Sequence, residues 1–308
     1  PICVCSTGHK AMSGQSYRSG FISIVGSPNV GKSTLTNAFI GQKVSIVSER
    51  AQTTRNRIMG VMTRSGYQIV FLDTPGVTTP KNRLGEYMLK SAYETLNEVD
   101  AVVLVIDATR GVGPKDEALI ARLASAKAPV IAVINKVDVS NLVGIEEIEE
   151  YLSHQVFIKR MFRISAMKRT GLAELERALS ELLPEGPQYF PPNMITDMPE
   201  RVILGEIIRE KALNMLRQEI PHGVGVFIDK IEYGDTGICN IWATIYCERN
   251  SHKGIIIGRQ GSMLKRIASD ARKDMEWLLG CRINLQVWVK VKEDWRNSLS
   301  VMRELGYE

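Results

Sequence analysis

Short apolar runs alternate with stretches of helical periodicity between residue 21 and about residue 165. Apolar runs that alternate with helical segments are typical of a parallel sheet with crossover helices. The predicted strands are 21–26, 68–73, 101–107, 130–135 and 161–165, and an additional strand at 57–64 is predicted to pair with 68–73 in a hairpin. This part of the chain is therefore predicted to be an α/β domain with a mostly parallel sheet and flanking helices.

The predicted parallel strands end at residues that can bind a ligand. In an open α/β sheet, ligands bind beyond the carboxyl ends of the strands. Gly26, Asp73, Asn135 and Ser165 are therefore expected at one edge of the sheet.

Four prolines within residues 184–192 interrupt the alternation. Proline prevents helix formation and stiffens a linker, so a domain boundary is predicted here. After it we expect a helix at 200–218, strands at 224–233 and 239–247, a helix at 262–279, a strand at 282–291 and a short terminal helix. The predicted division is an extension at 1–18 that is disordered, a first domain at 19–185, a linker at 186–199 and a smaller α+β domain at 200–308.

Composition excludes several classes of protein. The 308 residues are 44% hydrophobic and 24% charged, which excludes collagen-like and disordered chains. No apolar stretch approaches the roughly 18 residues of a membrane-spanning helix. The five cysteines are an odd number without a CxxC pair, which argues against a disulfide scaffold and a zinc site and favours a reducing cytoplasm.

The distribution of charge is more informative than its total. The net charge is +5, but residues 195–308 carry 17 basic and 16 acidic side chains, or +1. Within 249–273, seven basic side chains face the single acid Asp270, a local excess of +6. An anionic partner is expected to bind there.

The first predicted strand leads directly into a Walker A sequence and then into a helix. The nine residues of this segment are Gly26, Ser27, Pro28, Asn29, Val30, Gly31, Lys32, Ser33 and Thr34. The glycines let backbone N–H groups surround a phosphate, Lys32 reaches the outer phosphates, and Ser33 can bind Mg²⁺. A glycine turn that opens a helix is the alternative, and the strand before the loop argues against it.

The second predicted strand ends in Asp73-Thr74-Pro75-Gly76. Alone, this tetrapeptide is more often a turn. Next to a Walker A loop, Asp73 is predicted to orient Mg²⁺, and the Gly76 N–H to contact a terminal phosphate. The next residue is Val77, where Ras-like enzymes place a glutamine that orients the attacking water. Slow intrinsic hydrolysis is therefore expected, with the water positioned by the backbone, a partner or ions.

Asn135, Lys136 and Asp138 form an NKVD sequence after an apolar strand. A carboxylate at Asp138 can accept hydrogen bonds from the ring N–H and the exocyclic amine of guanine, whereas adenine offers no ring donor there. Ser165 and Ala166 are expected to complete the base site, with a backbone N–H toward the guanine oxygen.

A polar, basic segment at 47–58 lies between the Walker A helix and the second strand. In a GTPase this position belongs to the segment that becomes ordered when GTP is bound. Thr53 and Thr54 are the candidates for Mg²⁺ binding, and Thr54 is favoured. The predicted metal ligands are thus Ser33, Thr54 and Asp73, and the predicted catalytic set is Lys32, Thr54, Asp73 and Gly76.

The strongest candidate in the C-terminal part is a GxxG tetrapeptide between an apolar run and a basic helix. Glycines that bracket polar residues allow close approach of a sugar-phosphate backbone, as in the KH module. A plain glycine turn is the alternative. The predicted RNA-binding residues are Lys253, Gly258, Arg259, Gln260, Gly261, Lys265, Arg266, Arg272 and Lys273. The four tryptophans, by contrast, are expected in the core.

Taken together, these residues resemble the bacterial Era GTPase family. The resemblance rests on GSPNVGKS (26–33), AQTTR (51–55), DTPG (73–76), NKVD (135–138), ISA (164–166), EIIREK (206–211), IIGRQG (256–261), ARKDME (271–276) and WVKVK (288–292). It implies a Ras-like GTPase domain and a type II KH domain, with GTP or GDP as ligand and Mg²⁺ as cofactor.

The resemblance further implies binding of the 3′ end of 16S ribosomal RNA and a role in small-subunit biogenesis and 16S rRNA processing. It also implies a cytoplasmic protein with peripheral association with the inner membrane, and we expect a monomer. Two other functions remain open on the sequence: an RNA-binding scaffold with a structural guanine nucleotide, and a P-loop kinase of a small metabolite. The NKVD sequence argues against the kinase.

Overall fold

The structure is a computed structural model that describes residues 17–47, 55, 58–75, 80, 82–94, 98–216, 220–234 and 237–307. The described residues form two compact units, one built mainly from residues 17–197 and the other mainly from residues 198–307. No described helix is long and apolar enough to cross a membrane.

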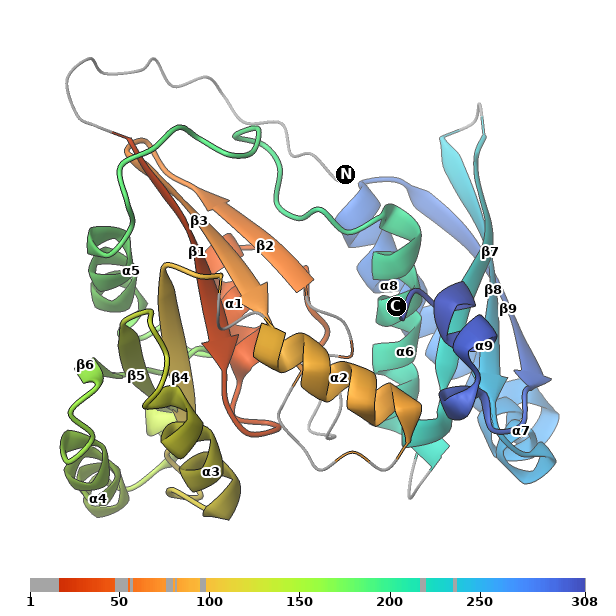
Figure 1. Cartoon of the computed structure of the whole chain (residues 1–308). Coiled ribbons are helices and arrows are strands. Elements are labelled where there is room, and N and C mark those ends of the chain that lie inside the picture. The colour runs from red at the N-terminus through yellow and green to blue at the C-terminus, as the bar shows by residue number, and fades with distance from the viewer. Residues whose placement is uncertain are drawn as a thin grey trace. The chain divides into compact units, whose positions relative to one another are not determined.

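The first unit contains a six-stranded sheet with the order β2-β3-β1-β4-β5-β6 (Figure 1). Its strands are β1 (Arg18–Val25), β2 (Ile58–Thr63), β3 (Tyr67–Asp73), β4 (Ala101–Asp107), β5 (Val130–Asn135) and β6 (Ile158–Arg163). All neighbours are parallel except β2 and β3, which form the predicted antiparallel hairpin. All seven residues of β4 are buried, as expected of a central strand covered on both faces.

Helices cover both faces of this sheet. The covering helices are α1 (Lys32–Ile40), α3 (Pro114–Leu123), α4 (Leu142–Ser153) and α5 (Leu172–Glu181). Helix α2 (Arg83–Glu94) is divided, since its residues as far as Tyr87 group with the second unit and those from Met88 with the first. One core joins the sheet to α1 and α5, where Phe39 stacks on Phe71 at 4.9 Å between ring centroids. A second core joins the opposite face to α3 and α4 through residues such as Leu119 and Ile148. This layering confirms the predicted α/β class and leaves the strand ends for a ligand.

The sixth strand differs from the prediction, since β6 spans Ile158–Arg163 rather than 161–165. Ser165 lies beyond the strand, in a turn where its backbone forms an isolated antiparallel bridge with Thr170. The β5–β6 register also shifts between Val130 and Ile131. An apolar run alone does not reveal such a shift.

The proline-rich segment after α5 packs on the first unit. The buried Gln68 on β3 donates to the Phe190 carbonyl at 2.9 Å and accepts from the N–H groups of Tyr189 and Phe190 at 3.0 and 2.9 Å. The Tyr189 ring stacks on Phe21 of β1 at 5.5 Å between centroids. The Val61 N–H donates to the Ile195 carbonyl at 2.8 Å, which places the segment along the edge strand β2. Much of the predicted linker is therefore fixed to the first unit.

The second unit is a three-stranded sheet with helices. Its elements are α6 (Glu200–Met215), β7 (Gly225–Tyr233), β8 (Ile238–Cys247), α7 (Asn250–Ile257), α8 (Ser262–Leu279), β9 (Arg282–Val291) and α9 (Leu299–Glu304). The strand order is β7-β8-β9, with β7–β8 antiparallel and β8–β9 parallel. Helices α6 and α8 pack on one face of the sheet (Figure 1). The helix predicted at 200–218 ends at Met215, and the apolar run before the GxxG sequence is helical.

The expectation that the tryptophans lie in the core is correct for one of them and wrong for two. Trp295 is completely buried and its Nε1 donates to the Gly223 carbonyl at 2.9 Å. Trp277 on α8 is 65% exposed and Trp288 on β9 is 45% exposed. Both positions lie on amphipathic elements whose other face forms the core, so a large apolar residue did not indicate burial.

Candidate functional site

The loop after β1 is shaped by two glycines. A Cβ on Gly26 would lie 2.5 Å from the Val105 carbonyl oxygen, and one on Gly31 would lie 2.2 Å from Asn135 Nδ2. No larger residue fits at these positions without displacing its neighbours. Gly31 (φ 101°) and Asn29 (φ 67°) have left-handed backbone conformations. Such turns direct successive N–H groups toward one side and form an anion-binding concavity.

Lys32 is the first residue of α1 and is buried against this loop. Its Nζ donates to the carbonyls of Gly26 and Ser27, each at 3.0 Å. Burial lowers the pKa of Lys32 to about 8, against the opposing influence of Asp73 and Asp116. The ammonium group therefore lies within the concavity, next to the positive end of α1, where a phosphate would be bound.

The remaining residues of the loop have supporting positions. Val30 is buried in the core between the sheet and α1, and Ser27 is buried beneath the loop. Pro28 and Asn29 are half-buried and present their carbonyls to cations of neighbouring loops. Ser33 and Thr34 are half-buried in the first turn of α1.

Asp73 ends β3 and is completely buried. Among the described residues, neither of its carboxylate oxygens has a hydrogen bond of ordinary geometry. Burial raises the pKa of Asp73, while Lys32 and the hydroxyls of Ser33 and Ser45 act in the opposite direction. Mg²⁺ prefers oxygen ligands such as carboxylates and hydroxyls. The residues present therefore fit a Mg²⁺ ion.

Thr74 and Pro75 follow Asp73 and are both buried. The Thr74 hydroxyl donates to the Ile24 carbonyl of β1 at 2.9 Å, so this side chain joins two strand ends. The predicted roles of Gly76, Val77, Thr53 and Thr54 concern residues outside the described part of the chain.

Asn135 connects the phosphate loop to the loop after β6. Its Nδ2 donates to the Val30 carbonyl at 2.8 Å, and its Oδ1 accepts from the Ala166 N–H at 3.0 Å. Both Asn135 and Ala166 are buried. One side chain therefore holds the two loops that were predicted to contact the two ends of a nucleotide.

Lys136 and Arg110 both bind Asp107 and both donate to the phosphate loop. Lys136 Nζ lies 2.6 Å from Asp107 Oδ2 and 2.7 Å from the Asn29 carbonyl oxygen. Arg110 Nε lies 3.2 Å from Asp107 Oδ2, and its NH2 donates to the Pro28 carbonyl at 3.0 Å. The sequence analysis missed Asp107 and Arg110. The available signal was that Asp107 ends a buried strand, like Asp73 and Asn135.

The base end of the site is open. Asp138 is exposed in the turn after β5. The turn begins at Lys136, whose backbone is left-handed (φ 68°) and ends the strand. Ser165 is buried, and its hydroxyl accepts from the Lys168 N–H at 3.0 Å. Asp138 is thus free to meet a base, whereas the Ser165 side chain supports its own loop.

In the second unit, the GxxG tetrapeptide is the turn between α7 and α8. Gly258 has a φ of 72°, and a Cβ there would lie 2.7 Å from that of Met263. Gln260 also has a left-handed backbone (φ 52°), and Gly261 has a φ of 77° with open space around its Cβ position. Arg259 and Gln260 are exposed at the tip. The turn brings backbone close to solvent at the start of a helix.

A cavity of about 480 Å³ lies between α8 and β9. Gly261, Lys265 and Arg272 line it on the helix side, where helical periodicity places them on one face. The other lining residues are Leu264, Ala268, Ser269, Ile283, Asn284, Leu285 and Val287. Sequence reasoning found the basic rim and missed this largely apolar lining, because single apolar residues of a strand give no sign of which cavity they face.

The other predicted basic residues do not line the cavity. Arg266 and Lys273 are exposed on α8, and Lys273 pairs with Asp270 at 3.1 Å. Lys253 is half-buried on α7, and Arg259 lies at the tip of the turn. The basic helix therefore divides into a cavity face and a separate solvent face.

The fold and the site define a P-loop guanine-nucleotide-binding protein joined to a KH-like module. The chain matches the family model for a 50S ribosome-binding GTPase over residues 21–136 and that for a KH domain over residues 219–296. It is 50% identical to "GTPase Era" of Alkaliphilus oremlandii over 95% of this chain and 99% of that protein. The corresponding protein of Clostridioides difficile is 49% identical over 94% and 99%. The chain belongs to the Era family of GTPases.

Solved structures of the family support this assignment along nearly the whole chain. Era in complex with MgGDPNP and nucleotides 1506–1542 of 16S ribosomal RNA matches with a TM-score of 0.90 and 41% identity, over 94% of this chain and 99% of that one. A variant of Aquifex aeolicus Era bound to GDP·AlF4⁻ matches with a TM-score of 0.89 and 40% identity over the same shares. The chain is thus a GTPase with a P-loop GTPase domain followed by a KH domain.

Proposed function

We propose that this GTPase is a molecular switch that binds the 3′ end of 16S ribosomal RNA through its KH domain. In this role it acts in small-subunit biogenesis and 16S rRNA processing. The related Era structure that contains both a GTP analogue and nucleotides of 16S rRNA supports the proposal. The observation in this chain that carries it is the cavity between α8 and β9, where Lys265 and Arg272 flank an apolar lining. A base can enter such a cavity while its phosphates meet the basic rim.

Residues 19–185 would form the switch, residues 186–199 the linker and residues 200–308 the RNA-binding domain. In the switch, residues 26–34 would bind the phosphates and Asp138 would select guanine. The Ala166 N–H, which donates to Asn135 Oδ1 in this structure, would reach the guanine oxygen only if that hydrogen bond opens or is shared. Ser33, Thr54 and Asp73 would hold Mg²⁺, which supplies positive charge to the β- and γ-phosphates. The buried Asp73 carboxylate supports this set, because the part of the chain that the structure describes gives its oxygens no hydrogen bond of ordinary geometry and only the Ser33 and Ser45 hydroxyls nearby.

The chain's own residues would assist hydrolysis through position and charge. Lys32 would leave the carbonyls of Gly26 and Ser27 for phosphate oxygens, and the Gly76 N–H would donate to the terminal phosphate. Val77 has no group that could orient the attacking water, so slow intrinsic hydrolysis is expected unless a partner or an ion positions it. Val77→Ala should leave turnover unchanged, whereas Asp73→Ala should abolish it.

The RNA-binding domain would contact its ligand through the GxxG turn and the cavity. Gly258, Arg259, Gln260 and Gly261 would lie along the RNA backbone, and Lys265 and Arg272 would bind phosphates at the rim. Lys253, Arg266 and Lys273 would add long-range attraction from outside the cavity.

The alternative function is an RNA-binding scaffold in which the guanine nucleotide is structural. The two functions differ in turnover, which can be measured as phosphate release from GTP by the full chain. A switch releases phosphate over many cycles and binds 16S rRNA differently with GTP and with GDP. A scaffold retains its nucleotide without releasing phosphate, and that result would refute the switch.

Base selection has a separate test. Asp138→Asn replaces an acceptor with an amide and should shift preference from guanine to xanthine nucleotides. Unchanged GTP affinity in this variant would contradict the role of Asp138.

We also propose a cytoplasmic monomer with peripheral association with the inner membrane. The family resemblance supports this location. Co-sedimentation of the full chain with anionic vesicles, and its mass in solution by light scattering, would test the two parts separately.

A further inference from the structure

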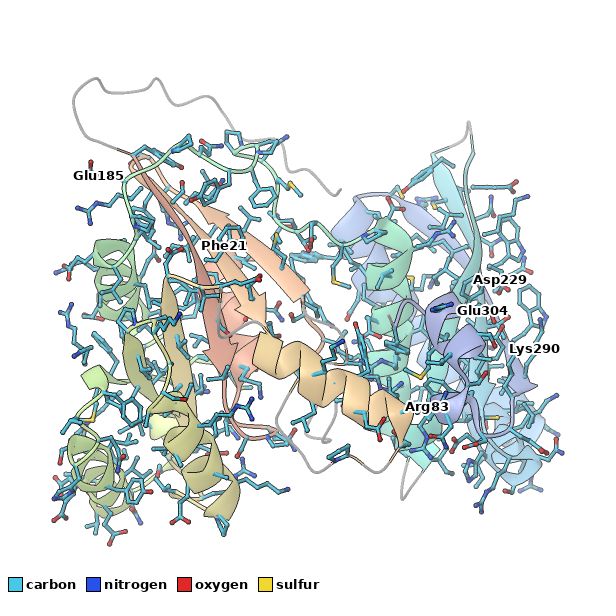
Figure 2. The ribbon with its side chains drawn as sticks, viewed as in Figure 1. Phe21, Arg83, Glu185, Asp229, Lys290 and Glu304 are labelled. Atoms are coloured by element: carbon cyan, nitrogen blue, oxygen red, sulfur yellow. The ribbon has the colours of Figure 1, made fainter. Side chains whose placement is uncertain are left out.

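The KH-domain sheet has a second face, opposite α6 and α8. Along β9, Ile283 and Val289 are buried, and the residues between them alternate between exposed and half-buried. The side chains of the other face on this strand are those of Arg282, Asn284, Gln286, Trp288 and Lys290. Four of the five are polar or charged and none is a carboxylate. We call this set the β9 outer row, and Figure 2 shows Lys290 on the side of the sheet away from α6 and α8.

The β9 outer row is continued on β8. Asn284 Nδ2 donates to Asn240 Oδ1 at 3.0 Å, which shows that the two side chains share a face. In the parallel register, Gln286 lies beside Trp242 and Trp288 beside Thr244. Trp242 is half-buried, with Lys230 Nζ 5.5 Å from its ring centroid. An aromatic surface and amide groups therefore lie together on this face, which is exposed along β9 and buried on β8 at Thr244 and Tyr246.

The acidic side chains of this face lie on β7 and α9 and already have partners. Asp229 accepts from the Thr244 hydroxyl at 2.8 Å, and Glu232 pairs with Lys230. Glu304 accepts from the Tyr246 hydroxyl at 2.9 Å and pairs with Lys292 at 3.0 Å. Within the described part of the chain, neither Lys290 nor Arg282 forms a direct ion pair, although Lys290 is close enough to Glu304 to help Lys292 lower the pKa of that carboxyl. Positive charge is therefore available along β9, at the edge of the sheet.

The β9 outer row is continuous with the RNA cavity. β9 is an edge strand, and its residues Ile283, Leu285 and Val287 line the cavity from the other face. A bound strand that leaves the cavity past Arg272 has only to pass the edge of β9 to reach Trp288. The rise of a strand, about 3.3 Å per residue, spaces alternate side chains by about 6.6 Å, which is close to the extended spacing between nucleotides.

We propose that the β9 outer row is a second RNA-binding surface, on which an unpaired nucleotide stacks on Trp288 while Lys290 and Arg282 contact its phosphates. The proposal rests on the proposed binding of RNA in the cavity and extends the bound segment beyond it. Half-exposed indole next to cations and amides is the chemistry by which sheet surfaces bind single-stranded nucleic acid. Trp288 is flanked along β9 by Gln286 and Lys290, so the row lacks the large contiguous apolar patch that marks many protein-binding surfaces.

The experiment compares two single-stranded RNAs on the full chain with a GTP analogue bound. One has about four nucleotides, the length that a GxxG module holds, and the other extends it by several nucleotides. Trp288→Ala should weaken binding of the longer RNA by between about 5-fold and about 150-fold and leave the short RNA unchanged. Trp288→Phe should recover part of the loss because it keeps a stacking ring.

Trp277→Ala is the matched control, since it removes an even more exposed tryptophan from α8 of the same domain. This variant should bind both RNAs with the affinity of the wild type. Equal affinities of Trp288→Ala and Trp277→Ala for the longer RNA would overturn the proposal. So would a Trp288→Ala protein that keeps its RNA affinity but no longer co-sediments with small subunits, because the face would then bind protein.

A third variant separates this proposal from the proposed function. Replacing Arg259 and Gln260 by glutamate should weaken binding of both RNAs if the cavity and its turn bind RNA. If neither RNA is affected by that variant, the proposed RNA site fails. If both are affected while Trp288→Ala changes nothing, only the second surface fails.

Discussion

Asp107 shows how a residue that touches no predicted ligand can shape the nucleotide site. Burial by itself raises the pKa of Asp107, but hydrogen bonds from Lys136 and Thr109 outweigh it and hold the pKa below its usual range. The ionised carboxylate thereby binds Lys136 and Arg110, whose other contacts are two consecutive carbonyls of the phosphate loop. These carbonyls point outward to the cations. Because the C=O and N–H of a trans peptide unit point in opposite directions, the N–H groups of Asn29 and Val30 point to the inner side of the loop.

Asp107→Asn should therefore weaken nucleotide binding. The amide keeps the shape of the side chain but removes the charge that holds two cations, and a hydrogen bond to a charged group contributes about 1.5–3 kcal/mol. We expect dissociation of a fluorescent GDP analogue to become about tenfold faster or more. Arg110→Ala, which keeps Lys136 in place, should give a smaller increase. An Asp107→Asn protein with the wild-type dissociation rate would contradict this role.

The lowered pKa of Asp107 also predicts how the stability of the protein depends on pH. Its folded-state pKa lies below the unfolded value, so its stabilisation is complete above the unfolded pKa of about 3.9 and is lost as the pH falls through the folded-state pKa. The difference in free energy of unfolding between wild type and Asp107→Asn should be constant near neutral pH and shrink in acid. Urea unfolding at several pH values measures it, and a difference that grew in acid would show that the shift has the opposite sign.

For single residues, the sequence predicts which residue types form the site better than it predicts the contacts that their side chains make. Asp73, Lys32 and Asn135 follow from motif and strand position, because the chemistry of phosphate and metal binding restricts the residues at those points. Asp107 and Arg110 do not follow, because their function depends on which loop each side chain reaches after folding.

Among the elements, α8 divides its charge between two faces. Lys265 and Arg272 line the cavity, whereas Arg266 and Lys273 do not. Both pairs are separated by seven residues, so the two faces carry the same charge in the same arrangement. They form a matched comparison.

The double variant Lys265→Ala/Arg272→Ala should reduce RNA affinity and its dependence on salt. Removal of one phosphate contact to a single strand reduces the magnitude of the log–log salt slope by about 0.7, so we expect a reduction of about 1.4. Arg266→Ala/Lys273→Ala removes the same charge and should change the slope much less. Titrations at several salt concentrations measure both. Equal salt slopes for the two variants would mean that RNA affinity depends only on the total charge of the helix and not on which face carries it.

The proline-rich segment owes its position to β3. Gln68 is buried and makes three hydrogen bonds to the backbone of Tyr189 and Phe190. The proline-rich composition predicted a linker without a helix, and the segment indeed forms no helix. It could not predict docking, because the partner lies 121 residues away from Tyr189 along the chain.

Gln68→Ala should destabilise the first unit and release this segment. Two backbone N–H groups would lose their acceptor, and each buried unsatisfied group costs about 1–3 kcal/mol. We expect a decrease of about 2–4 kcal/mol in the free energy of unfolding, together with faster protease cleavage within 186–195. Gln188→Ala removes an exposed second donor to the Phe190 carbonyl but leaves both N–H groups paired with Gln68, so it should change stability and cleavage much less. Unchanged cleavage in Gln68→Ala would mean that the other contacts, such as ring stacking on Phe21 and the Val61–Ile195 hydrogen bond, hold the segment without Gln68.

For the molecule as a whole, two ligand sites occupy separate units, each with its own core. The nucleotide site draws on β1, β3, β4 and β5, and the RNA cavity draws on α8 and β9. Damage to one site should therefore leave the residues of the other intact, so that each affinity measured without the second ligand stays unchanged. The overall charge of +5 predicted neither site, since the KH half carries +1 and the proposed RNA-binding residues lie in the segment 249–273, whose local excess is +6.

A pair of variants tests this separation. The acidic replacement of Arg259 and Gln260 should reduce RNA affinity at least about tenfold, because each added carboxylate repels a phosphate backbone, while GTP affinity stays within about twofold. Asp138→Asn should lower GTP affinity at least about tenfold and, compared with the wild type in the absence of nucleotide, keep the RNA affinity within about twofold. Calorimetric titration of each full-length variant with nucleotide and with RNA measures all four affinities. Loss of both ligands from either variant would indicate misfolding of that variant, which circular dichroism would reveal.

The buried side chain of Asn135 has a consequence for how the nucleotide site can be observed. Its carboxamide accepts from the Ala166 amide on one side and donates to the Val30 carbonyl on the other. That amide can exchange its proton with solvent only when the carboxamide moves, and the phosphate loop constrains the carboxamide. Hydrogen exchange at Ala166 therefore reports the opening of a loop that lies more than a hundred residues earlier in the chain, from a position that no phosphate touches.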